Sequence, residues 1–183
     1  MRINRIQTAA LFVDLQERLI PAMTDGTEVV QRSVMLLEGL KILGIPAVFL
    51  RQYPKGLGDT IPELRDAAGE HTPFDKLAYS ALQDEAIVAE FERLRERDIK
   101  NVIVCGVEAH VCVLQTCIDL VNAGFQPILV TDCVASRNPY DKEIALRRAE
   151  HENVLLTTVE SILFELCVVA GTDEFKAISK LVR

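Results

Sequence analysis

The 183-residue sequence has no hydrophobic run long enough to cross a bilayer and no cluster of basic residues. Its apolar stretches are of strand length and are broken by charges or proline, whereas a membrane-spanning helix needs about 20 apolar residues. The net charge is −7, and acidic and basic residues are mixed along the chain, which is not typical of a nucleic-acid-binding surface. We therefore expect neither a membrane nor nucleic acid as a partner.

Patterns typical of a disulfide framework or a metal site are also missing. The cysteines are odd in number and lie on apolar segments, and the short polar N-terminal lead runs directly into a strand without the features of a signal peptide. There is no CxxC pair, and the three histidines are scattered. The sequence therefore predicts a cytoplasmic protein with no metal and no cofactor. The five cysteines are Cys105, Cys112, Cys117, Cys133 and Cys167.

The sequence does contain an alternation of short apolar strands and amphipathic helices. Strands are expected at 9–14, 45–51, 74–79, 101–105, 126–131 and 153–157, and a Pro/Gly-rich loop follows the second of them at 52–64. Helices are expected at 27–43, 84–98, from 110 onward, and at 140–150, 159–170 and 173–181. This order predicts a three-layer α-β-α, Rossmann-like α/β fold. Its six-stranded sheet would be mostly parallel with helices on both faces, in a single domain over residues 1–183.

Cys112 is the first candidate for a functional residue. A buried strand at Asn101–Cys105 runs into Gly106, which permits a sharp turn, and a helix then begins with Cys112 in its first turn. Unpaired N–H groups and the helix dipole at that position favour the thiolate, so we expect a lowered thiol pKa and a nucleophile. The alternative is that Cys112 is a small buried residue.

Two charged residues are further candidates. Asp14 ends the first strand, at the edge of the sheet where α/β folds bind their ligands, although it could equally cap the following segment. Lys76 is flanked by apolar residues, and its side chain either reaches water or points inward, where it needs an anion such as Asp14 or a thiolate. No GxGxxG follows the first strand, which disfavours a dinucleotide site.

Three segments together resemble the isochorismatase-like, or nicotinamidase-like, cysteine hydrolases along essentially the whole chain. These segments are DLQ at Asp14–Gln16, FDKLAYSAL with Lys76, and GVEAHVCVLQTCIDL with Cys112. The loop RQYPKGLGDTIPEL is most similar to that of uncharacterised isochorismatase-domain hydrolases. The separation and order of the three segments make the resemblance specific.

The resemblance implies a catalytic triad, in which Cys112 is the nucleophile, Asp14 exchanges the thiol proton and Lys76 supports the charge between them. It also implies a cis peptide between Val107 and Glu108, and an oxyanion hole formed by the backbone N–H groups of Glu108 and Cys112. Members of this family assemble as dimers or larger oligomers, which is implied for this chain as well.

Two departures from the family pattern refine the expectation. The nicotinamidase branch has an Asp-x-His zinc site after the second strand, where this chain has Arg51, Gln52 and Tyr53. The residue after Glu108 is often threonine in the family and is Ala109 here. Isochorismatase proper does not depend on the cysteine, so the presence of Cys112 indicates the amidase side of the family.

The sequence thus predicts a metal-independent cysteine hydrolase that cleaves a small-molecule amide, ureido or related C–N bond through a thioester on Cys112. Two alternatives are a catalytically idle binding protein with the same scaffold and a thiol-redox protein that uses Cys117. His110 is expected to face away from the site or toward solvent. Possible pocket residues are Gln16, Arg51, Tyr53, Phe74 and Tyr79.

Overall fold

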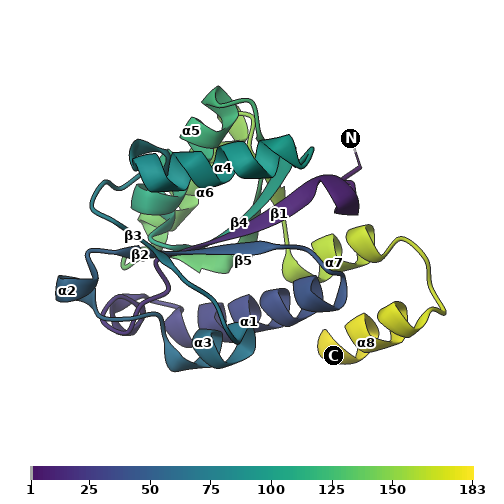
Figure 1. Ribbon diagram of the computed structural model, residues 1–183. Coiled ribbons are helices and arrows are strands. Elements are labelled where there is room, and N and C mark those ends of the chain that lie inside the picture. The colour runs from purple at the N-terminus through teal and green to yellow at the C-terminus, as the bar shows by residue number, and fades with distance from the viewer. Residues whose placement is uncertain (1) are drawn as a thin grey trace.

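A six-stranded sheet forms the centre of the computed structural model, which describes residues 2–183 (Figure 1). All strand pairs are parallel, in the order β3-β2-β1-β4-β5-β6, which confirms the predicted sheet. The strands are β1 (Thr8–Val13), β2 (Ala47–Gln52), β3 (Phe74–Lys76), β4 (Asn101–Val107), β5 (Gln126–Ala135) and β6 (Leu155–Thr157). The inner strands β1 and β4 are buried along their whole length, because helices cover both faces of a parallel sheet.

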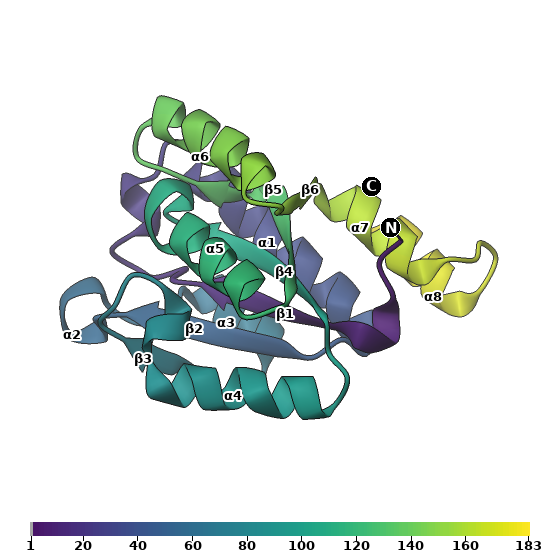
Figure 2. The same cartoon turned by 90° about the horizontal axis from the view of Figure 1, so that it is seen from above.

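Helices cover both faces of this sheet and confirm the three-layer prediction (Figures 1 and 2). One layer contains α1 (Gly26–Ile42), α3 (Pro62–Ala68), α7 (Val159–Cys167) and α8 (Asp173–Leu181). The other contains α4 (Glu85–Glu96), α5 (Leu114–Asn122) and α6 (Pro139–His151). Between residues 2 and 183, no helix combines the length and the apolar character that a membrane crossing requires.

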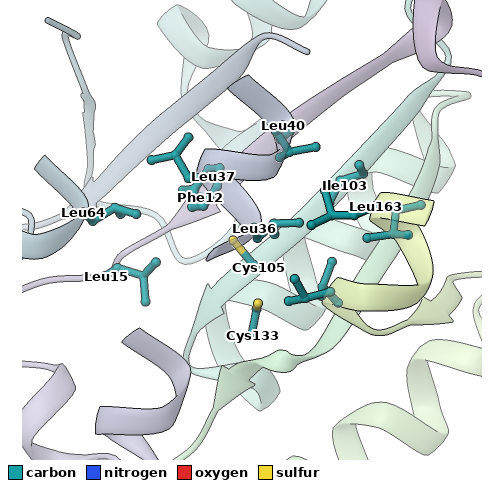
Figure 3. Close-up of a cluster of buried hydrophobic side chains, with 14 of the residues drawn as sticks. Phe12, Leu15, Leu36, Leu37, Leu40, Leu64, Ile103, Cys105, Cys133 and Leu163 are labelled. Carbon is teal, nitrogen blue, oxygen red and sulfur yellow. The ribbon is translucent and has the colours of Figure 1, made fainter. Parts of the chain in front are cut away.

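The core is divided by the sheet into two apolar layers. Figure 3 shows the layer beneath α1 and α7, where Leu36 and Leu163 lie close to Ile103 of β4. Cys105 and Cys133 belong to the same layer, whereas Cys112 and Cys117 belong to the layer under α4, α5 and α6. The catalytic candidate is therefore separated by the sheet from the Cys105 and Cys133 thiols.

Three local predictions were wrong at the ends of elements. The expected loop at 52–64 contains α2 (Pro54–Leu57) and the start of α3, because Pro54 and Pro62 occupy the first helical position that proline favours. Strand β5 continues past residue 131 to Ala135 across a shift in register. Helix α7 ends at Cys167 rather than at residue 170, since the next residue, Val168, has a φ of 64°.

Gly106 allows the two central strands to approach each other. Its φ is 126°, and a Cβ atom at this position would lie 1.9 Å from the carbonyl oxygen of Val13. Residues with a side chain rarely adopt this conformation, and the neighbouring backbone atom cannot move aside as a flexible side chain would. Gly106 therefore sets how closely the ends of β1 and β4 can lie.

We expect Gly106→Ala to lower the free energy of unfolding by at least about 3 kcal/mol, because backbone strain and overlap add together. Urea unfolding followed by circular dichroism measures this loss. Gly124→Ala is the matched control: Gly124 also has a positive φ, of 84°, but no atom lies within 4 Å of its added Cβ. Equal losses in the two variants would contradict the role assigned to the contact with Val13.

Candidate active site

The candidate site lies where the strand order reverses. β1 and β4 are neighbours in the sheet, but the chain continues from β1 to β2 on one side and from β4 to β5 on the other. Ligands of open α/β sheets bind in the crevice at such a point, beyond the carboxyl ends of the strands. Asp14 directly follows β1, Lys76 ends β3, and Cys112 lies on the turn after β4. The structure brings these three residues together.

Asp14 and Lys76 form a buried ion pair. The Lys76 Nζ atom lies 2.7 Å from Asp14 Oδ2, and neither side chain is exposed. The ammonium also donates to Gln52 Oε1 at 2.6 Å and to the carbonyl oxygen of Tyr79 at 3.2 Å. A buried ion needs such additional partners, because leaving any of its N–H groups without an acceptor is costly. Lys76 thus points inward, which is one of the two orientations its sequence context left open.

Gln52 is a site residue that we did not predict for this role. The Gln52 Nε2 atom donates to the carbonyl oxygen of Leu77 at 2.8 Å, which directs the Oε1 atom of the same amide toward Lys76. Gln16 supports it by accepting from the Gln52 N–H at 2.7 Å and donating to the Gln52 carbonyl at 3.0 Å. Gln52 lies two residues after the buried Leu50 on β2 and so shares its face of the sheet. This spacing was the signal in the sequence that the Gln52 side chain points inward.

The Cys112 thiol lies within reach of both charges of the ion pair and is only 6% exposed. Its residue belongs to a π-helical turn, Ala109–Val113, and the α-helix begins only at Leu114. Burial and the negative charge of Asp14 raise the pKa of Cys112 to about 12, against the opposing effect of Lys76. The expected lowering of the thiol pKa was therefore wrong, because the helix-start argument ignores the loss of solvent around the sulfur.

The Asp14 carboxylate lies beside this thiol. Burial raises its pKa above the ordinary value, while the charge of Lys76 and hydrogen bonds from Lys76 and Cys112 act in the opposite direction. Within residues 2–183, Asp14 Oδ1 has no partner at normal hydrogen-bond geometry, whereas Oδ2 is occupied by Lys76. A protonated thiol beside a carboxylate can lose its proton directly to that carboxylate when the sulfur attacks a substrate.

The turn before Cys112 carries the backbone groups predicted to form an oxyanion hole. The peptide bond between Val107 and Glu108 is cis. The carbonyl oxygen of Glu108 accepts from the N–H groups of Val111 at 3.1 Å and Val113 at 3.2 Å. By contrast, no acceptor for the Glu108 N–H is found in the part of the chain that the structure describes. The Glu108 N–H is thus available as a hydrogen-bond donor close in sequence to the Cys112 thiol.

The remaining predicted pocket residues lie around the site in different ways. Arg51 points to the face of β2 opposite to Gln52, where it pairs with Asp59 and Asp75 at 2.7 Å each. Tyr53 and Tyr79 are about half exposed or more, at 50% and 57%. Phe74 is partly buried and packs against the core layer that contains Cys112, and Gln16 is fully buried.

His110 lies on the π-helical turn that also carries Cys112. His110 is half-buried, and its Nδ1 atom pairs with Ser136 Oγ at 2.9 Å. It therefore does not turn out to solvent, but its hydrogen bond is to the segment after β5 rather than to Asp14. Across residues 2–183, no three His, Cys, Asp or Glu side chains are grouped as a metal ion would require.

The fold and the site define a parallel α/β protein with a buried cysteine beside an ion pair, and comparisons with known proteins give its family. The isochorismatase domain matches residues 8–161, and the chain belongs to this family, as the resemblance predicted. The chain is 37% identical over 172 residues to isochorismatase domain-containing protein 1 of Danio rerio, covering 93% of this chain and 59% of that protein. It therefore spans about three fifths of that relative's length.

Two further comparisons cover nearly complete chains. The sequence is 35% identical over 188 residues to the secreted isochorismatase effector Isc1 of Phytophthora sojae (strain P6497), covering 100% of this chain and 89% of that protein. A solved structure, described as the MAR1 ribonuclease from Caenorhabditis elegans, superimposes with a TM-score of 0.91 at 36% identity. The superposition covers 100% of this chain and 92% of that one.

Asp14→Asn removes the charge that raises the thiol pKa and leaves Lys76 without its counter-ion. We expect the pKa of Cys112 to fall, because the thiolate then becomes the anion beside the ammonium. Iodoacetamide alkylation of Cys112 should increase at least about tenfold at neutral pH, as a fall of one pKa unit requires. The alkylation rate is measured against pH by mass spectrometry. The control is Asp119→Asn, which neutralises a carboxylate on α5 that accepts a hydrogen bond from Ser80. An unshifted pH curve would contradict the effect of Asp14.

Gln52→Leu removes an acceptor of the buried ammonium at similar side-chain volume. We expect the free energy of unfolding to fall by about 1–3 kcal/mol, the cost of leaving a buried donor without a partner. Urea unfolding compares this variant with Gln31→Leu, which changes an exposed glutamine on α1. A loss no greater than that of the control would show that Gln52 is dispensable for holding Lys76.

Proposed function

We propose that the chain is a metal-independent cysteine hydrolase of a small amide, ureido or related C–N substrate. The observation that carries this proposal is the meeting of the Cys112 thiol with the Asp14–Lys76 pair at the switch point of the sheet. Membership of the isochorismatase domain family supports an enzyme of the hydrolase class. The end of β2 carries Arg51, Gln52 and Tyr53 in place of a zinc-binding Asp-x-His, which supports a reaction without metal.

The proposed reaction begins with attack of the Cys112 sulfur on the carbonyl carbon of the substrate. The thiol proton passes to Asp14 as the C–S bond forms, so a free thiolate is not needed beforehand. The negative charge that develops on the carbonyl oxygen is stabilised by the N–H groups of Glu108 and Cys112. Asp14 returns the proton to the leaving nitrogen as the C–N bond breaks, which leaves a thioester on Cys112.

A second half-reaction completes the cycle. Asp14, again a carboxylate, removes a proton from a water molecule that attacks the thioester carbon. The C–S bond breaks, the carboxylic acid leaves, and the sulfur takes the proton back. Lys76 remains an ammonium throughout, and it limits the cost of the negative charge that alternates between the carboxylate and the oxyanion.

A catalytically idle binding protein is the second candidate, and the raised thiol pKa is the observation that favours it. A nucleic-acid substrate has less support, although one solved relative is described as a ribonuclease. A net charge of −7 repels a polyanion, and the basic residues are not clustered in sequence.

A homo-oligomer, a dimer or larger, stays a prediction, as does a location in the cytoplasm.

Cys112→Ala tests the proposed function. The substitution removes one buried sulfur atom, so we expect a folded protein in which turnover falls to background. Turnover is screened with small amides and ureides while mass spectrometry follows an acyl adduct on Cys112. Cys117→Ala is the matched control, because Cys117 is a fully buried thiol on α5 whose pKa is raised by burial with no charged neighbour. Full turnover in Cys112→Ala would end the proposal. A disulfide between Cys112 and Cys117, trapped with a mild oxidant, would favour the redox alternative.

A further inference from the structure

The carboxylate of Glu108 is held by a residue outside the site. It accepts hydrogen bonds from the backbone N–H of Arg137 at 3.0 Å and from the guanidinium Nε at 3.0 and 3.2 Å. Only 10% of the Glu108 side chain is exposed, against 66% for Arg137. Burial opposes ionisation of Glu108, but the hydrogen bonds and the charge of Arg137 outweigh it and hold the pKa of Glu108 below its ordinary value.

This contact holds Glu108, whose backbone N–H has no acceptor within residues 2–183. The carbonyl oxygen of Glu108 is already held by the N–H groups of Val111 and Val113, and its carboxylate is held by Arg137. With both of these groups fixed, the direction of the Glu108 N–H is fixed as well. An oxyanion hole requires such preorganised donors, because donors that must reorient during the reaction stabilise the charge less.

Arg137 itself comes from an anchored segment. Its carbonyl oxygen accepts from the hydroxyl of Thr24 at 2.8 Å. The preceding residue, Ser136, is buried and pairs with His110 on the same turn as Glu108. The segment after β5 and the turn after β4 are thus joined by two contacts, Ser136 with His110 and Arg137 with Glu108. The anchored segment therefore holds Arg137, and through it Glu108, in place.

We propose that Arg137 is a positioning residue for the oxyanion hole and acts through Glu108. This inference rests on the proposed function. It predicts that Arg137 matters for acyl transfer to Cys112, in which a carbonyl oxygen becomes negative. It further predicts that Arg137 does not matter for alkylation of the same sulfur by iodoacetamide, in which iodide leaves and no oxyanion forms.

The test uses p-nitrophenyl acetate as the acyl donor. The Cys112 sulfur attacks the acetyl carbon, its proton passes to Asp14, the ester C–O bond breaks, and p-nitrophenolate leaves. We expect Arg137→Ala to slow acetylation by about 10- to 100-fold, as displaced catalytic groups do. The rate of alkylation by iodoacetamide should stay within about twofold of that of the parent protein. The midpoint of thermal unfolding should stay within a few degrees of the parent value. Glu108→Gln should slow acetylation similarly, and the double variant should be no slower than either single one.

Arg147→Ala is the matched control, since Arg147 on α6 is also 66% exposed and pairs with Glu143. It should change neither rate. If acetylation of Arg137→Ala equals that of the parent, or if alkylation falls in parallel with it, the role assigned to Arg137 is overturned while acyl transfer at Cys112 stands. If the parent protein forms no acetyl adduct on Cys112, the proposed function is overturned together with this inference.

Discussion

Two opposite charges lie 2.7 Å apart in the interior, on Asp14 and Lys76, with no exposed side-chain surface on either. Removing an ion from water costs several kcal/mol, so such a pair persists only where its geometry and its remaining hydrogen bonds are fixed. Lys76 ends the edge strand β3, Asp14 follows β1, and Gln52 ends β2 between them. The lysine therefore extends across the end of β2, and the pair fixes the carboxyl ends of three strands relative to one another.

The protonation state of the Cys112 thiol depends on the Asp14–Lys76 ion pair. Because Asp14 and Lys76 neutralise each other, the Cys112 sulfur lies beside a dipole rather than beside a bare cation, and burial has the largest effect on its pKa. A protonated thiol reacts slowly with oxidants and alkylating agents. In the proposed reaction the sulfur attacks a substrate while the proton moves to Asp14, so the same arrangement would protect the thiol from oxidation in the absence of substrate.

Much of the fold, and the residues that meet in the site, could be predicted from the sequence. Apolar strands that alternate with amphipathic helices predict the parallel sheet, and the resemblance to a family indicated the inward orientation of Lys76. The thiol pKa could not be predicted, because it depends on how many atoms exclude water from the sulfur. The hydrogen bond from Lys76 to Gln52 could not be predicted either, because strand parity gives the face of a residue but not its partner. The π-helical turn at Ala109–Val113 depends on packing after β4, which has no local signature.

The Asp14–Lys76 and Glu108–Arg137 ion pairs differ in their contact with the solvent. Asp14 and Lys76 are enclosed, so dissolved salt cannot enter between them, whereas Arg137 is 66% exposed where it meets Glu108. Mobile ions screen charges at a surface over about 8 Å at physiological ionic strength, and they screen enclosed charges far less. Dissolved salt therefore weakens the ion pair on the turn that carries Glu108 and leaves the Asp14–Lys76 pair beside Cys112 nearly unchanged. The two ion pairs thus respond differently to the ionic strength of the solution.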